Sequence, residues 1–223
     1  MEASDKTMKI LVTAGGTRED IDDVRGITNY STGRLGSEIA GLFLDEGAEV
    51  TYICGENAIL SSLPYSSANL EIIKIRNVAQ LAAQLENALN STKYNCVIHS
   101  MAVSDYTPVE PKSDSKISSD LEYITITLQR TPKVINIIKK IQPQTTLIGF
   151  KLLSNSSENE LVEAGLNLLK NSKCDYILAN DLKNITETHH KAILLNSDGI
   201  MARAENKQEI AEIIYKKITG GAK

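Results

Sequence analysis

The chain has 223 residues, enough for one well-packed core but too few for two large domains. Hydrophobic residues make up 42% and charged residues 23%, as in ordinary soluble proteins, and no apolar run reaches the roughly 18 residues of a membrane span. The net charge of -4 argues against a nucleic-acid-binding protein, which would normally present a basic face.

The first residues, MEASDKTMKI, lack the basic-then-apolar order of a signal peptide. Cys54, Cys96 and Cys174 lie far apart without CxxC spacing, so neither a disulfide framework nor a zinc site is indicated. We therefore expect a cytoplasmic protein whose cysteines are small buried hydrophobic residues.

The first half of the chain alternates between strand and helix patterns. MKILVTA (8–14) is a short apolar run bounded by glycine, which is typical of a buried parallel strand. From Gly33, apolar residues recur at helical spacing until Gly47. Strands are then predicted at 48–54, 70–75 and 95–103, with a helix over 78–89 between the last two.

The second half begins with residues 104–120, which have no periodicity and are rich in serine, proline and charge, so we predict a long flexible loop. EYITITLQ (122–129) alternates like a half-exposed strand, and residues 131–142 open with proline and continue as a helix. The remaining predicted elements are strands at 145–151, 174–180, 192–196 and 200–203, a hairpin turn at 197–199, and helices at 157–171 and 206–218.

This alternation predicts a single α/β domain over residues 1–223, with a mostly parallel sheet between two layers of helices and a loop and β-hairpin excursion. Ligands of such sheets bind at the carboxyl ends of the strands. Four strand-end segments would then face one crevice: 14–17, 102–105, 149–151 and 179–181. Each is weak evidence alone, because strands also end in small or polar residues for turn chemistry.

Glycines and hydroxyls mark the first strand-to-helix turn. Gly15 and Gly16 allow a backbone to approach a ligand closely, and Ser31, Gly33 and Gly36 open the next helix, where free N–H groups favour an anion. A di- or triphosphate would fit there. An ordinary helix cap at Ser31 or Thr32 explains the same residues without a ligand.

The insertion between Gly16 and Gly33 carries more polar groups than a nucleotide-binding turn needs. Arg25 suits a phosphate monoester, and the Asn29 amide can donate to a carboxylate or acyl oxygen, so both could contact a second substrate. Asp105 could accept from a substrate hydroxyl or help to hold Mg²⁺. Lys116 could close over phosphates, although a lysine in a polar loop is commonly just solvated.

The histidines do not indicate a metal site. His99 lies inside a predicted strand, and His189 and His190 lie beside a turn without a pattern of carboxylates. The identity of the metal ligands is therefore left open.

Together, TAGGTRED, DDVRGITNYSTGRLG, AVSDY, GFK and LAND, in this order and spacing, resemble the phosphopantothenate–cysteine ligases of coenzyme A biosynthesis, in the stand-alone bacterial form. The resemblance implies a Rossmann-like fold, a homodimer, and ligation of 4'-phosphopantothenate to L-cysteine through an acyl-nucleotide, with Mg²⁺ and with CTP or ATP. It further implies roles for individual residues. The nucleotide would contact Gly15, Gly16, Ser31, Gly33, Gly36, Phe150 and Asn180, with Lys116 at its phosphates.

The resemblance also implies that Asn29, Ala102 and Asp105 would hold the pantothenate arm and its carboxylate. Arg25 would bind the pantothenate phosphate across the dimer interface. Asn29 is the residue expected to stabilise the acyl-nucleotide, with Asp105 and Lys116 assisting catalysis. The chain departs from relatives near the nucleotide, at Lys116–Ser119 and at Thr131–Lys133, so the choice between CTP and ATP stays open.

Two other classes of protein share parts of this pattern. A short-chain reductase has a similar first turn but relies on a Tyr-x-x-x-Lys pair, and none of the eight tyrosines here is followed by such a lysine. A non-catalytic nucleotide sensor would need the phosphate-binding turn but not Arg25, Asn29 or Lys116.

Overall fold

The computed structural model describes residues 7–64, 66–111, 115–186 and 188–221, which are organised around an eight-stranded sheet. The strand order is β5–β4–β1–β6–β9–β10–β11–β12. The strands are β1 (Lys9–Ala14), β4 (Glu49–Gly55), β5 (Leu70–Ile75), β6 (Cys96–His99), β9 (Thr146–Leu153), β10 (Tyr176–Ile185), β11 (His190–Asn196) and β12 (Gly199–Ala204). The first six strands in this order, β5, β4, β1, β6, β9 and β10, are parallel. Strands β11 and β12 join them as an antiparallel hairpin.

The order of the strands reverses beside β1. From β1 the chain moves outward to β4 and β5, then returns to the other side of β1 with β6. Parallel sheets bind ligands outside the carboxyl ends of the strands at such a switch point. The four predicted strand-end segments do lie at one edge of the sheet, because β1, β6, β9 and β10 are parallel neighbours.

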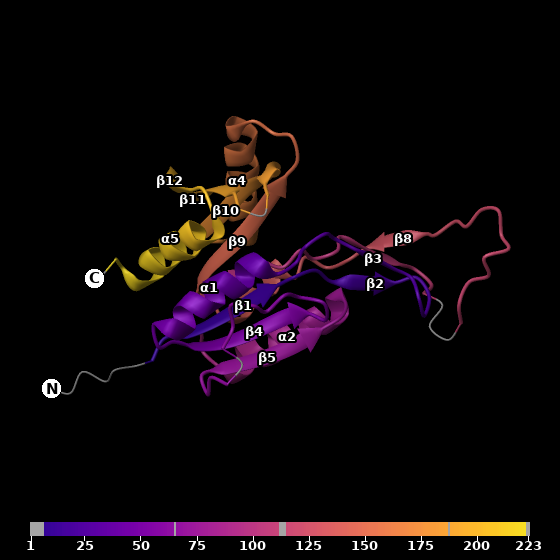
Figure 1. Ribbon diagram of the computed structural model, residues 1–223, viewed down its shortest axis with the longest axis horizontal. Coiled ribbons are helices and arrows are strands. Elements are labelled where there is room, and N and C mark those ends of the chain that lie inside the picture. Colours follow the sequence, from indigo (N-terminus) through magenta and orange to yellow (C-terminus); the bar gives the residue numbers. More distant parts are fainter. Residues whose placement is uncertain (1–6, 65, 112–114, 187, 222–223) are drawn as a thin grey trace.

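Helices cover both faces of the sheet (Figure 1). One face carries α1 (Arg34–Asp45) and α5 (Lys207–Thr219), and the other carries α2 (Val78–Ser91), α3 (Ile135–Ile141) and α4 (Glu158–Ser172). Ile39, Phe43 and Ile214 are fully buried on the first face, as are Leu81 and Ile138 on the second. The apolar stripes of the helices are thus buried against the sheet, and the predicted three-layer Rossmann-like α/β fold is confirmed.

Two short hairpins leave the sheet and form a projecting arm (Figure 1). We call "the arm" the described residues of 18–28 and 106–130. It contains β2 (Arg18–Asp20) paired with β3 (Gly26–Thr28), and β7 (Tyr106–Pro108) paired with β8 (Leu128–Arg130). The sequence pattern indicated no strand between Gly16 and Gly33 and predicted a flexible loop at 104–120. The first segment contains β2 and β3, and the second contains β7.

The predicted strand at 122–129 is wrong over most of its length, since only Leu128–Arg130 is a strand. Tyr123 is 82% exposed, and Ile124 and Ile126 are exposed as well. An alternating segment becomes a strand when it finds a partner and a core to cover. Here only the end of the segment pairs, with β7, and its apolar side chains stay exposed.

Other elements differ at their ends. The strand predicted at 95–103 stops at His99, although Ala102 still pairs with Gly16 in an isolated parallel bridge. The helix predicted at 131–142 begins only at Ile135. None of the helices in the described residues is both long and apolar enough to cross a membrane.

Candidate functional site

A cavity of about 300 Å³, here called the sheet cavity, lies where β6, β9 and β10 end and α1 begins. Six residues that the sequence predicted for ligand binding line it together: Ser31, Gly33, Gly36, Ala102, Phe150 and Asn180. Phe150 and Asn180 lie on the same face of the sheet, because Phe150 is opposite Leu178 and Asn180 is opposite Leu152. The register thus places an aromatic side chain diagonally beside an amide.

The amino terminus of α1 opens into this cavity without a capping side chain. Its N-cap is Gly33, whose φ of 77° is left-handed, and the first turn holds no acidic residue. By contrast, α2, α4 and α5 begin with side-chain caps from Asn77, Ser157 and Asn206. The N-cap is therefore neither Ser31 nor Thr32, although the Thr32 hydroxyl accepts a long hydrogen bond from the Arg34 N–H at 3.5 Å. The start of α1 can still present backbone N–H groups to an anion.

Two glycines are required by close packing beneath the turn. A Cβ on Gly33 would lie 3.1 Å from the Ala58 Cβ and 3.2 Å from the Gly15 nitrogen, at a backbone angle that side chains rarely adopt. A Cβ on Gly36 would lie 2.4 Å from the Ala14 Cβ. These residues let α1 approach the end of β1 closely. Gly15 itself lies in this packed layer and lines neither of the two cavities described here.

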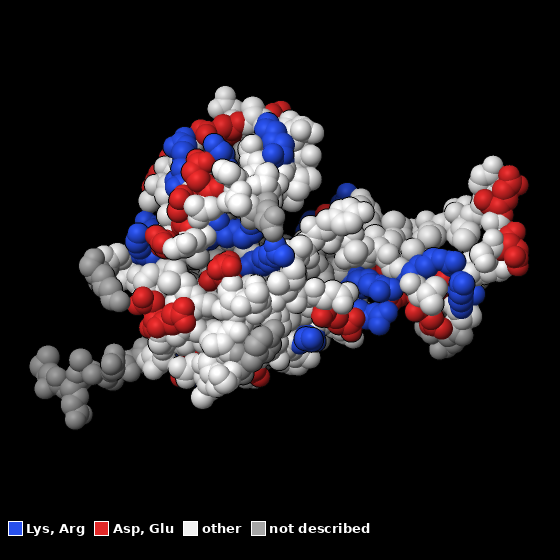
Figure 2. All heavy atoms as spheres, viewed as in Figure 1, with Lys and Arg blue, Asp and Glu red and all other residues white. Residues whose placement is uncertain are grey.

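The electrostatics of the sheet cavity favour a negatively charged ligand. Arg34 and Lys207 contribute to its wall, and none of the described residues that line it is acidic. Figure 2 shows a hollow between the lobe that carries α4 and the rest of the molecule, with Lys and Arg side chains beside it. The cation charges and the uncapped helix together suit phosphate groups.

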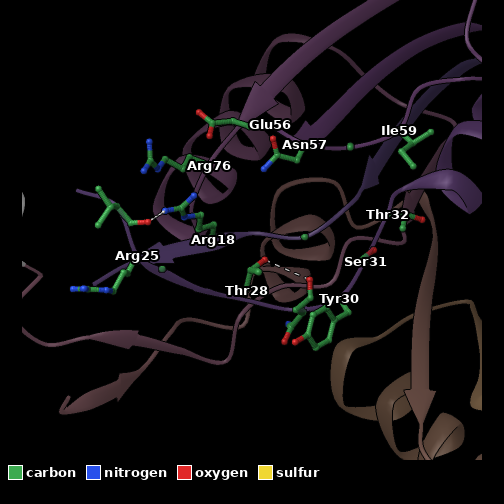
Figure 3. A pocket seen from close by; sticks show the side chains of 15 residues that line it. Arg18, Arg25, Thr28, Tyr30, Ser31, Thr32, Glu56, Asn57, Ile59 and Arg76 are labelled. Carbon is green, nitrogen blue, oxygen red and sulfur yellow. Dashed lines mark hydrogen bonds between the residues drawn. The ribbon is translucent and has the colours of Figure 1, made fainter. Parts of the chain in front are cut away.

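A second and larger cavity, of about 710 Å³, lies at the base of the arm, and we call it the arm cavity (Figure 3). Its walls include Gly16, Arg25 and Asn29, together with Arg18 and Arg76, which the sequence analysis did not select. Residues 30–32 line both cavities. One short segment therefore separates two spaces, each large enough to receive part of a ligand.

Arg25 is held on the arm by a buried carboxylate. Its guanidinium donates to Asp22 at 2.7 Å and to the Ile117 carbonyl at 3.2 Å. Burial opposes ionisation of Asp22, but N–H groups of Ile117, Val24 and Arg25, with the Arg25 charge, outweigh it and lower the pKa of Asp22 to about 2. Arg25 points away from Arg18 and Arg76 (Figure 3), so it does not join them in one cluster.

Asn29 lies over the switch point of the sheet. Its side-chain nitrogen donates to the Val103 carbonyl at 3.2 Å, and its own carbonyl accepts from the Ser31 N–H at 2.9 Å. A Cβ on Gly16 would lie 3.0 Å from the Asn29 carbonyl oxygen. The structure thus brings Asn29, Gly16 and the segment at Ala102 together.

Asp105 and Lys116 lie outside the linings of both cavities. The Asp105 carboxylate is exposed and pairs with Lys133. Lys116 is exposed and precedes Ile117, whose N–H donates to Asp22 at 3.0 Å, so it lies on the arm beside Arg25. Within the described residues, no group of three or more His, Cys, Asp and Glu side chains could hold a metal ion.

Sequence reasoning missed several cavity residues that the strand-end rule could have found. Arg76 directly follows β5, and Glu56 follows β4, so both lie at the same edge as the four segments that were selected. His190 begins β11, and because β11 is antiparallel, its start also lies at this edge. His190 and Lys207 both line the sheet cavity.

Comparisons with known proteins identify the family. The family model described as "DNA/pantothenate metabolism flavoprotein C-terminal domain" matches residues 6–221. The coenzyme A biosynthesis bifunctional protein CoaBC of Thermococcus kodakarensis is 36% identical over 94% of this chain and 50% of its own length, and that of Methanocaldococcus jannaschii is 31% identical over the same shares. The chain thus spans about half the length of these curated relatives.

Solved structures agree with this match. The DNA/pantothenate metabolism flavoprotein of Streptococcus pneumoniae has a TM-score of 0.88 and 38% identity, with 97% of this chain and 100% of that chain covered. Cab2 carrying the H337A change, in complex with phosphopantothenate-cysteine, shares the fold with a TM-score of 0.75 at 20% identity, over 96% of this chain and 87% of that one. The family expected from the sequence motifs is thereby confirmed, and the chain belongs to the DNA/pantothenate metabolism flavoprotein C-terminal domain family.

Proposed function

We propose that this chain is a phosphopantothenate–cysteine ligase. It joins 4'-phosphopantothenate and L-cysteine to give 4'-phosphopantothenoylcysteine, and it uses CTP, or alternatively ATP, with Mg²⁺. Relatives that carry the name of a coenzyme A biosynthesis protein support the pathway.

One observation carries the proposal: the segment at residues 30–32 lines both the sheet cavity and the arm cavity. A ligase that activates one substrate with another must hold both with their reacting atoms in contact. A shared wall between two binding spaces does this, and holding two reactants in position lowers the barrier by removing the entropy cost of their encounter.

The nucleotide occupies the sheet cavity in this proposal. Its phosphates lie at the uncapped start of α1, at Ser31, Gly33 and Gly36, and its base lies against Phe150 and Asn180. Gly15 and Gly16 shape the turn below. Mg²⁺ usually binds through substrate phosphates, several waters and one or two carboxylates, so the nucleotide phosphates would supply part of its coordination. Asp105 is the carboxylate proposed to assist, after release from Lys133.

The phosphopantothenate carboxylate would lie near Asn29 and Ala102. One of its oxygens attacks the α-phosphorus of the nucleotide, the bond to the β-phosphate oxygen breaks, and pyrophosphate leaves. The amine of cysteine then attacks the acyl carbon, the bond to the nucleotide oxygen breaks, the nucleoside monophosphate leaves, and the attacking nitrogen loses a proton. Negative charge develops on the acyl oxygen in this second step. The Asn29 amide, one hydrogen of which donates to the Val103 carbonyl, would donate its other hydrogen to this oxygen.

A second copy of the chain completes the site in this proposal. The Arg25 guanidinium is fixed on the arm rather than turned toward Arg18, which agrees with a role at the partner's substrate phosphate. Lys116 lies on the same arm and would reach the nucleotide phosphates when the two copies of the chain associate. The arm also exposes apolar side chains at Val109, Leu121 and Tyr123, which are more than 40% exposed. Large apolar side chains that are exposed on one projecting segment are commonly covered by another chain.

The test is pyrophosphate release with 4'-phosphopantothenate, cysteine and Mg²⁺, run in parallel with CTP and ATP. Release that depends on phosphopantothenate, with the cysteine adduct seen by mass spectrometry, supports the ligase and identifies the nucleotide. No release with either nucleotide refutes it. Sedimentation of the same sample measures the oligomeric state, and a monomer at assay concentration would refute the proposed role of the arm.

A further inference from the structure

A histidine and an asparagine meet in the wall of the sheet cavity. The Asn180 Nδ2 lies 3.0 Å from the His190 Nε2, and each residue is only 7% exposed. The register explains the pair: Asn180 is opposite Ala192, and the irregularity that follows in β10 leaves His190, two residues from Ala192, on the same face. Both side chains line the cavity.

The chemistry of the two groups determines which atoms are protonated. An amide nitrogen can only donate a hydrogen bond, so the His190 Nε2 must accept, and the proton of the neutral ring lies on Nδ1. Burial, with a smaller contribution from Lys207, lowers the pKa of His190 to about 4, so the ring is neutral near pH 7. Its Nδ1 is buried and has no hydrogen-bond partner among the described residues.

This contact fixes the direction of the Asn180 amide. With Nδ2 turned toward His190, the Oδ1 atom is left as the group that can face the cavity, and no described residue donates to it. Phe150 lies diagonally beside Asn180 and offers an aromatic face. A planar base stacked on Phe150 would therefore meet a hydrogen-bond acceptor at its edge.

We propose that His190 is a positioning residue for nucleotide selection, because it holds the Asn180 amide with its oxygen toward the base. An acceptor at this point favours a base with an exocyclic amino group, cytosine or adenine, over one with a carbonyl there, uracil or hypoxanthine. A polar group left unpaired against the wrong base is the usual source of such discrimination. This inference rests on the proposed function in placing the nucleotide in the sheet cavity.

The test compares nucleotides that differ only in this group, CTP with UTP and ATP with ITP. The wild type should favour the amino member of each pair in pyrophosphate release. His190→Met and His190→Leu, two apolar replacements of different shape, should reduce the preference roughly tenfold, the loss of one hydrogen bond. His190→Gln, which can still accept from Asn180, should retain the preference, and His189→Gln, a change at the exposed neighbour, serves as the control.

A purely structural role for His190 gives a different result. It would lower activity with both members of each pair alike and leave their ratio unchanged, which would overturn the inference. A wild type that favours UTP or ITP would overturn it as well, because it would place the amide nitrogen toward the base.

Calorimetric binding of the four nucleotides separates this inference from the proposed function. If selective binding is lost in the apolar variants while no ligation occurs in the wild type, His190 has the inferred role and the ligase proposal fails. If the wild type ligates and the variants keep their selectivity, the ligase stands and the role of His190 is wrong. If no nucleotide binds, both fail.

Discussion

Replacing Asn29 by alanine should separate catalysis from folding and from nucleotide binding. The side chain makes one hydrogen bond, to the Val103 carbonyl at 3.2 Å, in an exposed setting. Losing such a bond costs about 1 kcal/mol, and for a chain of this size that lowers the unfolding temperature by only about 2–4 °C. The side chain belongs to the arm cavity rather than the sheet cavity, so nucleotide affinity should be unchanged.

Product formation should fall much further than stability. Removal of a donor aimed at a developing oxyanion typically reduces kcat by about 10²–10³-fold. Single-turnover formation of the cysteine adduct measures this loss, and calorimetry measures nucleotide binding on the same preparation. Asn87→Ala, an exposed change on α2 away from both cavities, is the matched control and should behave as the wild type. Unimpaired ligation by Asn29→Ala would refute the role assigned to this residue.

Three further outcomes are expected from local contacts. Asp22→Asn removes the charge that holds Arg25, so KM for 4'-phosphopantothenate should rise about tenfold, in line with the loss of a charged hydrogen bond, while KM for the nucleotide stays constant in steady-state assays. Gly36→Ala places a Cβ 2.4 Å from the Ala14 Cβ, and this overpacking should cost about 1–3 kcal/mol in thermal unfolding. Burial lowers the pKa values of His99 and His190 to about 4, so between about pH 6.5 and pH 4 the unfolded chain binds more protons than the folded one. Urea unfolding should therefore show stability decreasing as the pH is lowered from about 6.5 to about 4, by at most about 1.4 kcal/mol per pH unit for each histidine, and a flat profile would contradict the assignment.

Local pattern was sufficient to predict the central elements and much of the sheet cavity. The apolar run at 8–14 is buried on both faces, as β1 in the middle of a parallel sheet must be, and the apolar stripe of α2 reappears in the core. Since the carboxyl ends of parallel strands meet at one edge, the positions of Phe150 and Asn180 in the cavity also follow from strand ends read along the chain.

The arm depends on contacts between distant segments, which no local pattern contains. Residues 18–28 look like a polar loop because their short strands have no apolar alternation, and their geometry is held by remote partners. The Asp22 carboxylate accepts from the Ile117 N–H, more than ninety residues away, and Arg76 binds Asp20. The strand prediction at 122–129 failed for a different reason. The alternation favours a strand, but the apolar side chains of this segment have no surface to cover and stay exposed.

The contact between Asn180 and His190 also depends partly on local sequence and partly on tertiary structure. The sequence predicts a buried strand that ends at Asn180, where a polar residue signals a ligand site, although β10 continues to Ile185 in the structure. It does not show that an antiparallel strand returns beside β10, or that an irregularity after Asn180 brings His190 alongside it. Strand ends are a property of local hydrophobic pattern, whereas the orientation of an amide within a site depends on which strands become neighbours and in which register.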